Sequence, residues 1–145
     1  MWSSSGGFDF RDLTFWVVRH QQAIADQLGV HVTDFKTLGI LHRKGAMTPK
    51  NLAKEIAVTP AAMTTIVDRL EKVGYARRKR ENEDHRVITV YATKNSFRRV
   101  TELYRSLEVA TRKLNSRYTT KELQTIFRYL REGTSALQSA TAALL

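Results

Sequence analysis

The sequence contains no cysteine among its 145 residues, which excludes disulfide bonds, thiolate metal sites and thiol-based redox sensing. No apolar run approaches the roughly 18 residues that a membrane-spanning helix needs. The N-terminal residues also lack the basic region and the apolar run of a secretory signal peptide. These absences predict an intracellular, cytoplasmic protein that does not bind within a membrane.

Acidic residues are scarce relative to basic ones. The chain has 14 Asp and Glu against 24 Lys and Arg, which gives a formal net charge of +10. Such an excess favours a polyanionic partner, either nucleic acid or a membrane surface, and charge alone does not choose between them. The hydrophobic content of 42% is sufficient for the core of one domain of ordinary size.

Motifs of catalysis are also missing. The chain has no cysteine nucleophile, no glycine-rich phosphate loop, no HExxH helix and no serine-centred elbow. Its four histidines show no spacing typical of metal ligands, and they are His20, His31, His42 and His85. The sequence therefore predicts a protein that is not an enzyme and that uses no cofactor or metal.

Proline occurs only twice, each time after a threonine, at Thr48-Pro49 and at Thr59-Pro60. A threonine N-cap followed by proline at the first helical position is a favoured helix start. Two successive helices are therefore predicted, and the turn between them is short enough for a helix-turn-helix. Apolar periodicity predicts helices over 10–28, 33–44, 49–56, 60–74, 94–117 and 119–133, followed by a terminal segment at 134–145.

Two β-strands are predicted over 75–80 and 87–92, on either side of a polar turn. The first strand contains four consecutive cations, Arg77, Arg78, Lys79 and Arg80. A basic hairpin beside a helix-turn-helix predicts a DNA-binding wing. The alternative for the same cations is a solvated edge strand whose charges prevent further pairing. The predicted fold class is mainly α with a small β wing.

A longer pattern joins these segments. Its parts are Leu52-Ala53, Thr59-Pro60, Asp68-Arg69-Leu70-Glu71-Lys72-Val73-Gly74, Arg78 and Asp84-His85-Arg86. In this spacing the chain resembles the MarR (multiple antibiotic resistance regulator) family of bacterial and archaeal transcription regulators. The resemblance implies one domain over 1–145, with a winged helix-turn-helix lobe at 31–93 and dimerisation helices at 1–30 and 94–145.

Two departures from the family pattern concern the DNA-binding lobe. The family often has Leu-Thr-x-x-Gly after the second wing strand, where this chain reads Ala-Thr-Lys-Asn-Ser at 92–96. The family's recognition helix often carries Ser or Thr near its start and Arg midway, whereas this helix has Ala61, Ala62 and Thr65. Fewer strong hydrogen-bonding groups therefore point at bases.

The predicted DNA-binding residues lie at the helix starts, on the outer face of the recognition helix and on the wing. They are Thr48, Thr59, Pro60, Ala61, Ala62, Thr64, Thr65, Arg69, Arg78, Lys79, Arg80, Asp84, His85 and Arg86. The alanine and threonine methyl groups suit contacts with thymine methyl groups. By resemblance, Arg86 enters the minor groove. Asp84 either orients Arg86 or shapes the turn, and Asp68 is predicted as a partner for a wing arginine.

The terminal helices hold more apolar residues than one small core can bury. Among them are Phe8, Trp16, Tyr104, Phe127, Tyr129 and Leu144. This surplus predicts a twofold homodimer. Its two recognition helices would lie about 34 Å apart, one turn of DNA, and would bind a near-palindromic operator. By resemblance, a small aromatic or amphipathic effector binds between the dimerisation helices and the DNA-binding lobe. Trp16, His20, His42 and Tyr104 are the candidates to line its pocket, and core packing is the alternative role for them.

The predicted function is a homodimeric, sequence-specific DNA-binding transcription regulator, acting as repressor or activator. The alternative is a sequence-tolerant architectural DNA-binding protein of winged-helix type, which the net charge of +10 and the alanine-rich recognition helix would also suit. A small-molecule carrier without DNA binding is disfavoured by the intact basic hairpin.

Overall fold

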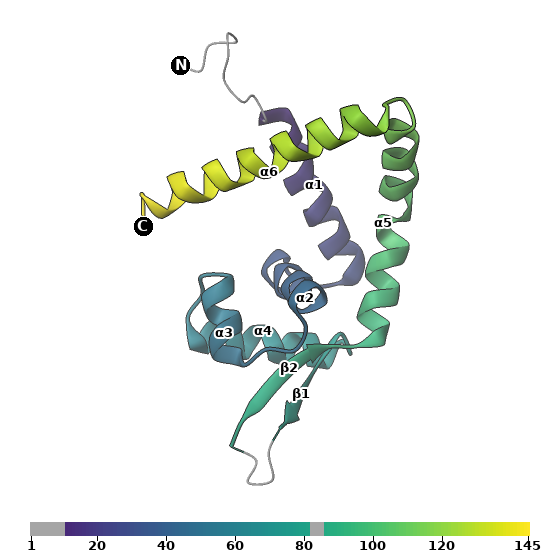
Figure 1. Ribbon diagram of the computed structural model, residues 1–145. Coiled ribbons are helices and arrows are strands. Elements are labelled where there is room, and N and C mark those ends of the chain that lie inside the picture. Colours follow the sequence, from purple (N-terminus) through teal and green to yellow (C-terminus); the bar gives the residue numbers. More distant parts are fainter. Residues whose placement is uncertain (1–10, 82–85) are drawn as a thin grey trace. The chain divides into compact units, whose positions relative to one another are not determined.

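The computed structural model describes residues 11–81 and 86–145, and combines helices with one small sheet (Figure 1). In chain order the elements are α1 (Arg11–Leu28), α2 (Val32–Lys44), α3 (Pro49–Glu55), α4 (Pro60–Lys72), β1 (Ala76–Arg80), β2 (Ile88–Ala92), α5 (Lys94–Asn115) and α6 (Thr120–Ala142). The predicted fold class, mainly α with a small β wing, is confirmed. Most element ends lie within one or two residues of the predicted ones.

The chain divides into two compact units. Residues 12–104 form the first, and residues 105–145 belong to the second. The predicted DNA-binding lobe at 31–93 lies within the first unit. That unit also contains α1 and the first half of α5, which the sequence had assigned to dimerisation helices.

The core of the first unit explains why α1 belongs to it. Only the last turns of α1 are buried, through Ile24, Ala25 and Leu28. They pack with apolar side chains of α2, α3, α4 and the sheet, namely Phe35, Leu38, Ile40, Leu41, Leu52, Ala53, Met63, Ile66, Val67, Leu70, Tyr75, Ala76 and Val90. The first half of α1 is exposed, so the helix is anchored at its C-terminal end alone.

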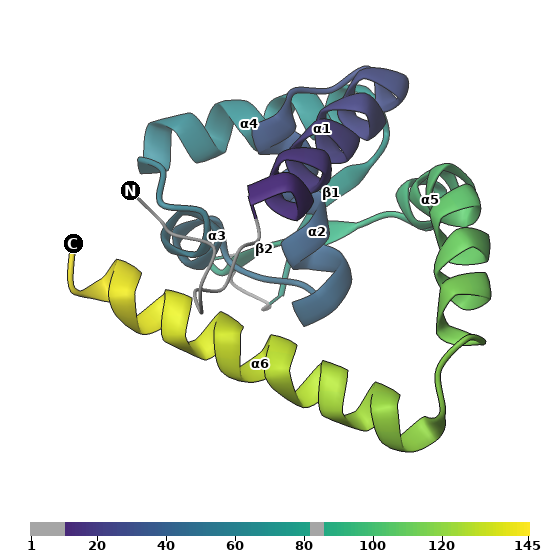
Figure 2. The ribbon, with the colours of Figure 1, turned by 90° about the horizontal axis from the view of Figure 1, so that it is seen from above.

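The helix-turn-helix consists of α3 and α4, and α4 also packs against α2 and β1 (Figures 1 and 2). In the turn, Ala57 has a φ of 56°, which is the left-handed region that glycine normally occupies at helix ends. Its N–H donates to Lys54 O at 3.3 Å, and the Val58 N–H donates to Ala53 O at 3.0 Å. These bonds end α3 and turn the chain into α4.

The sheet pairs β1 and β2 antiparallel, in a register that joins Ala76 to Ala92 and Arg80 to Ile88. A third segment, not predicted from the sequence, pairs with the other edge of β2. Met47 and Val90 exchange two backbone hydrogen bonds, of 3.0 and 2.7 Å. Backbone hydrogen bonds therefore connect the segment before α3 to the wing, in addition to the packing of α4 against β1.

Helix α6 belongs to the second unit and is longer than predicted. The predicted capping box is present, because the Thr119 hydroxyl oxygen accepts the Glu122 N–H while the Glu122 carboxylate accepts the Thr119 N–H. The predicted end at Gly133 is wrong, since the helix continues to Ala142. An interior glycine weakens a helix by only about 1 kcal/mol, which the helix formers around it outweigh. No helix of the described ranges is both long and apolar enough to cross a membrane.

Candidate nucleic-acid interface

The outward face of α4 carries small and polar side chains. Ala61, Thr64, Thr65 and Asp68 are exposed and recur at i, i+3, i+4 and i+7, so they form one stripe, and Ala62 is half-buried beside it. The opposite face is held in the core by Met63, Ile66, Val67 and Leu70. Because these packing residues recur with the period of the helix, the core determines which residues face outward.

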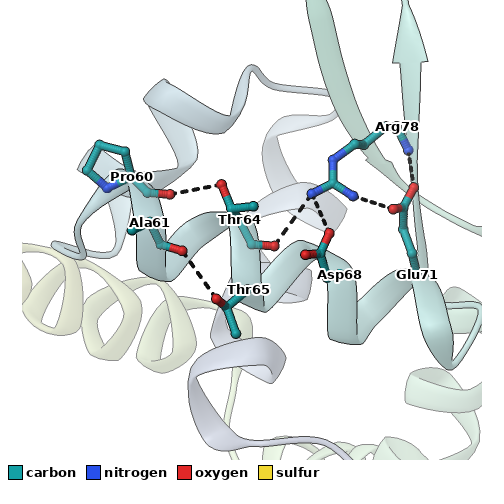
Figure 3. A network of polar contacts seen from close by, with 7 residues as sticks. All are labelled: Pro60, Ala61, Thr64, Thr65, Asp68, Glu71 and Arg78. Carbon is teal, nitrogen blue, oxygen red and sulfur yellow. Dashed lines mark hydrogen bonds and ion pairs between the residues drawn. The ribbon is translucent and has the colours of Figure 1, made fainter.

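The hydroxyl groups of both exposed threonines donate to carbonyls one turn earlier (Figure 3). Thr64 Oγ1 lies 3.2 Å from Pro60 O, and Thr65 Oγ1 lies 3.3 Å from Ala61 O. The hydroxyl hydrogens are used within the helix, whereas the oxygen lone pairs and the methyl groups remain at the surface. This part of α4 therefore offers methyl groups and hydrogen-bond acceptors.

Arg78 on β1 joins the wing to the recognition helix, as Figure 3 shows. Its Nη2 lies 2.8 Å from Asp68 Oδ1, and its Nη1 donates to Glu71 Oε2. The backbone N–H of Arg78 also donates to Glu71 Oε1 at 2.9 Å. The prediction that Asp68 pairs with a wing arginine is confirmed. The guanidinium of Arg78 is thus engaged by α4 and is not projecting from the wing.

Arg69, another predicted DNA-binding residue, is engaged on the other side of α4. Its Nε and Nη2 donate to the two carboxylate oxygens of Asp34 in α2, at 2.9 and 2.6 Å. The side chain of Asp34 has no exposed surface, and that of Arg69 is 37% exposed. These hydrogen bonds raise the pKa of Arg69 above its usual value, against the opposing effect of its burial. The pair holds α4 against α2.

Thr48 and Thr59 are N-caps, as the sequence predicted. The Thr48 hydroxyl oxygen accepts the Asn51 N–H at 3.3 Å, and the Thr59 hydroxyl oxygen accepts the Ala62 N–H at 3.1 Å. Each cap precedes a proline at the start of its helix. These two predicted DNA-binding residues therefore define where α3 and α4 begin.

Thr59→Ala is expected to lower the free energy of unfolding by about 1 kcal/mol, because the Ala62 N–H loses its acceptor at the start of α4. Urea unfolding followed by circular dichroism, at a fixed chain concentration, measures the loss. Thr59→Ser retains the oxygen and is the control, with stability expected close to that of the parent. Equal losses in the two variants would contradict the capping role.

The wing presents cations to solvent. Lys79 and Arg80 are exposed on β1, and Arg86 is exposed where the chain returns to β2. Asp84 and His85, which were also predicted to contact DNA, lie outside the described residues. The role predicted for Arg86 in the minor groove agrees with its position next to the hairpin tip, and it stays a prediction.

The four residues predicted to line an effector pocket separate into distinct surroundings. His20 and Tyr104 form an edge-to-face pair with ring centroids 5.4 Å apart, and His20 Nε2 is buried without a hydrogen-bond partner. His42 stacks on Phe97 at 4.0 Å. Trp16 is 65% exposed. Burial lowers the pKa of His42 and raises that of Tyr104, so both side chains favour their neutral forms.

A line of hydrogen bonds links His42 to the end of the recognition helix. His42 Nε2 lies 3.0 Å from Ser96 Oγ, and the Ser96 hydroxyl donates to Thr93 O at 2.8 Å. The only hydroxyl hydrogen of Ser96 is therefore used, so Nε2 of His42 is the protonated nitrogen. The Thr93 hydroxyl donates to Gly74 O at 2.7 Å, and the Thr93 N–H donates to Tyr75 O at 3.0 Å. This connection was not predicted from the sequence.

Metal binding has no support within residues 11–81 and 86–145, where His, Asp and Glu side chains form no group of three or more that could hold an ion. The arrangement instead combines a helix-turn-helix, whose second helix has a free outer face, with a cationic hairpin tied to it. These features define a winged helix-turn-helix protein.

Comparison with known sequences gives the family. The sequence model of the MarR family matches residues 30–88. The chain is 36% identical over 121 residues to the uncharacterized HTH-type transcriptional regulator YcgE of Bacillus subtilis, covering 83% of this chain and 79% of that protein. The chain belongs to the MarR family of transcriptional regulators.

Solved structures share the fold at low sequence identity. A MarR family protein from Bacillus stearothermophilus matches with a TM-score of 0.73 and 18% identity, over 89% of this chain and 90% of that one. A mutant of MepR from S. aureus, bound to an oligodeoxyribonucleotide, matches with a TM-score of 0.61 and 20% identity, over 88% and 94% of the two chains.

Proposed function

We propose that this MarR-family regulator is a cytoplasmic homodimer that binds double-stranded DNA at a near-palindromic operator. The observation that carries the proposal is the outward stripe of α4, which is exposed to solvent and lies beside a cationic hairpin. In this proposal α4 enters the major groove and Arg86 enters the minor groove next to it. The oligodeoxyribonucleotide bound to the MepR mutant, a protein of the same fold, supports this use of the fold.

Exposed apolar surface supports the homodimer. The first half of α1 exposes Leu13, Phe15, Trp16, Val17 and Val18. Helix α6 has no buried residue, yet Leu123, Ile126, Phe127, Leu130 and Leu137 recur on one side of it. An apolar stripe along a helix of 23 residues needs a partner surface, and a second copy of the chain supplies one.

Modulation by a small aromatic or amphipathic molecule is part of the same proposal. The support is the unpaired, buried Nε2 of His20 beside the ring of Tyr104. An acidic or hydroxylated aromatic ligand could give Nε2 the hydrogen bond that it lacks while packing on the Tyr104 ring. Of the four residues predicted for this role, these two form a ring contact with one another.

Binding selection in the presence of bulk genomic DNA tests the proposal against the architectural alternative. Duplexes of random sequence are incubated with the protein at physiological salt, and the bound fraction is sequenced. A regulator is expected to recover a near-palindromic consensus and to prefer it over genomic DNA by about a thousandfold or more. A preference near unity would favour the architectural protein, and failure to bind any duplex at low salt would remove both.

Arg86→Ala is expected to weaken binding to the recovered site and to reduce the slope of log K against log salt concentration by about 1 per protomer, because one cation leaves the interface. Fluorescence anisotropy over a range of salt concentrations measures both quantities. Arg86→Lys is the control, since it retains the charge and should retain the slope. An unchanged slope in Arg86→Ala, with normal folding, would remove the wing arginine from the proposed mechanism.

A further inference from the structure

The side chains on the first turns of the outward stripe of α4 have no hydrogen-bond donor that is not already used within the helix. The side chains there are those of Ala61, Thr64, Thr65 and Asp68. Both threonine hydroxyl hydrogens point to backbone carbonyls, of Pro60 and Ala61 (Figure 3). Asp68 is a carboxylate and accepts from Arg78. What remains free on this surface is methyl groups and oxygen lone pairs.

Both arginines that flank the stripe are held by carboxylates of the protein. Arg69 gives its Nε and Nη2 hydrogens to buried Asp34. Arg78 is divided between Asp68 and Glu71, with Thr64 O 3.5 Å from its Nη2. The remaining cation of α4 is Lys72, which lies three turns beyond Ala61, or roughly 16 Å along the helix axis.

The edges of the base pairs differ in the protein groups that they can bind in the major groove. In the major groove guanine offers only acceptors, O6 and N7, which need donors from the protein. An A·T pair offers the thymine methyl group and the adenine amino hydrogens, which need apolar contact and an acceptor. The stripe of α4 satisfies the second pair of demands and not the first. Because cytosine also presents an amino group to an acceptor, the methyl contact is what distinguishes A·T from G·C.

We infer that α4 is an A·T-reading surface, which selects its half-site through thymine methyl groups and adenine amino groups and makes no direct contact to purine N7 or guanine O6. This inference rests on the proposed function, since it assumes that α4 enters a major groove. In this inference Ala61 and Thr65 are the specificity-determining residues. Both expose a methyl group, and Thr65 also offers its hydroxyl oxygen as an acceptor.

Base analogues in the duplex recovered by random selection separate the two kinds of contact. Deoxyuridine replaces each thymine in turn and removes only the methyl group, while 7-deazapurines replace each adenine and guanine and remove only N7. Loss of one buried methyl contact is expected to weaken binding about fourfold per half-site. The 7-deazapurine duplexes are expected to bind within twofold of the parent, whereas a bidentate donor contact would be lost at roughly fivefold or more.

Matched variants at Thr65 test whether its methyl group makes the contact that deoxyuridine removes. Thr65→Ser removes the methyl group and retains the oxygen, so the deoxyuridine penalty at one thymine is expected to fall from about fourfold to near unity. Thr65→Val retains methyl groups and removes the oxygen, so that penalty is expected to persist. Both changes are on an exposed helix position and leave the core intact.

The outcomes are distinct. Penalties from deoxyuridine without penalties from 7-deazapurines, together with the response of Thr65→Ser, support the inference. Specific binding that loses roughly fivefold or more with 7-deazaguanine or 7-deazaadenine overturns it while leaving the proposed function in place. Specific binding that tolerates every deoxyuridine also overturns it. Failure to bind any duplex removes the proposed function and the inference together.

Discussion

Arg69→Met is expected to lower the free energy of unfolding by about 3 kcal/mol, because the carboxylate of Asp34 would be left buried without a charged partner. Asp34 has no exposed side-chain surface and takes both of its charged hydrogen bonds from Arg69, at 2.9 and 2.6 Å. The expected loss is at the lower end of the range for buried pairs, since the Arg69 side chain is 37% exposed and water can enter beside it.

The double variant Asp34→Asn/Arg69→Met is the control for this prediction. It removes the unpaired charge of the Asp34 carboxylate and keeps the volume of the side chain at position 34. At least half of the lost free energy of unfolding is therefore expected to return. Urea unfolding of the parent, both single variants and the double variant, at one chain concentration, gives the coupling free energy. A double variant as unstable as Arg69→Met alone would show that the charge of Asp34 is not what Arg69 compensates.

Leu130→Glu/Leu137→Glu is expected to separate the proposed homodimer into monomers and to reduce affinity for a palindromic site by roughly a hundredfold to ten-thousandfold. Each monomer then binds one half-site without the effective concentration that linkage provides. Both leucines are exposed, at 38% and 67%, and lie on the apolar side of α6. Carboxylates there would have to be desolvated in an interface. Sedimentation measures the mass, and anisotropy measures the affinity.

The matched control carries the same change of charge on the other side of α6. Thr125→Glu/Ser139→Glu also adds two carboxylates to exposed positions of this helix, and both positions lie opposite the apolar side. It is expected to stay dimeric and to lose only the small part of DNA affinity that net charge accounts for. Dimers in both variants would contradict the use of the apolar side of α6 as the interface, and monomers in both would point to a general effect of charge.

Local signals in the sequence were sufficient for most of the fold. Thr48 and Thr59 mark helix starts because an N-cap acts on the N–H groups within its own first turn. The capping box at Thr119 is equally local. Two features lacked such a signal. Ala57 adopts a left-handed φ without being glycine, and Gly133 lies inside a helix without ending it. At Ala57 the packing of the helix-turn-helix overrides residue preference, whereas at Gly133 the surrounding helix formers outweigh the cost of the glycine.

The candidate interface was predictable in outline and incomplete in detail. The exposed stripe of α4 follows from helical periodicity, so Ala61 and Thr65 could be placed correctly from spacing alone. The partners of the arginines could not. Arg69 lies at the border of the stripe and turns to Asp34, which is 35 residues earlier in the chain, and spacing within one helix carries no information about such a pair. Arg69 and Arg78, both predicted to bind DNA, therefore form ion pairs within the protein.

The bonds from His42 through Ser96 and Thr93 to Gly74 have a mechanical consequence. They fasten α2, the first turn of α5 and the end of α4 to one another, in addition to the apolar contacts between them. Tilting α4 by itself would break several of these bonds at once. In the proposed homodimer, the proposed effector is therefore expected to move residues 12–104 as a rigid body. The distance between the two copies of this body, rather than a change within either, would then decide whether both contact the same duplex.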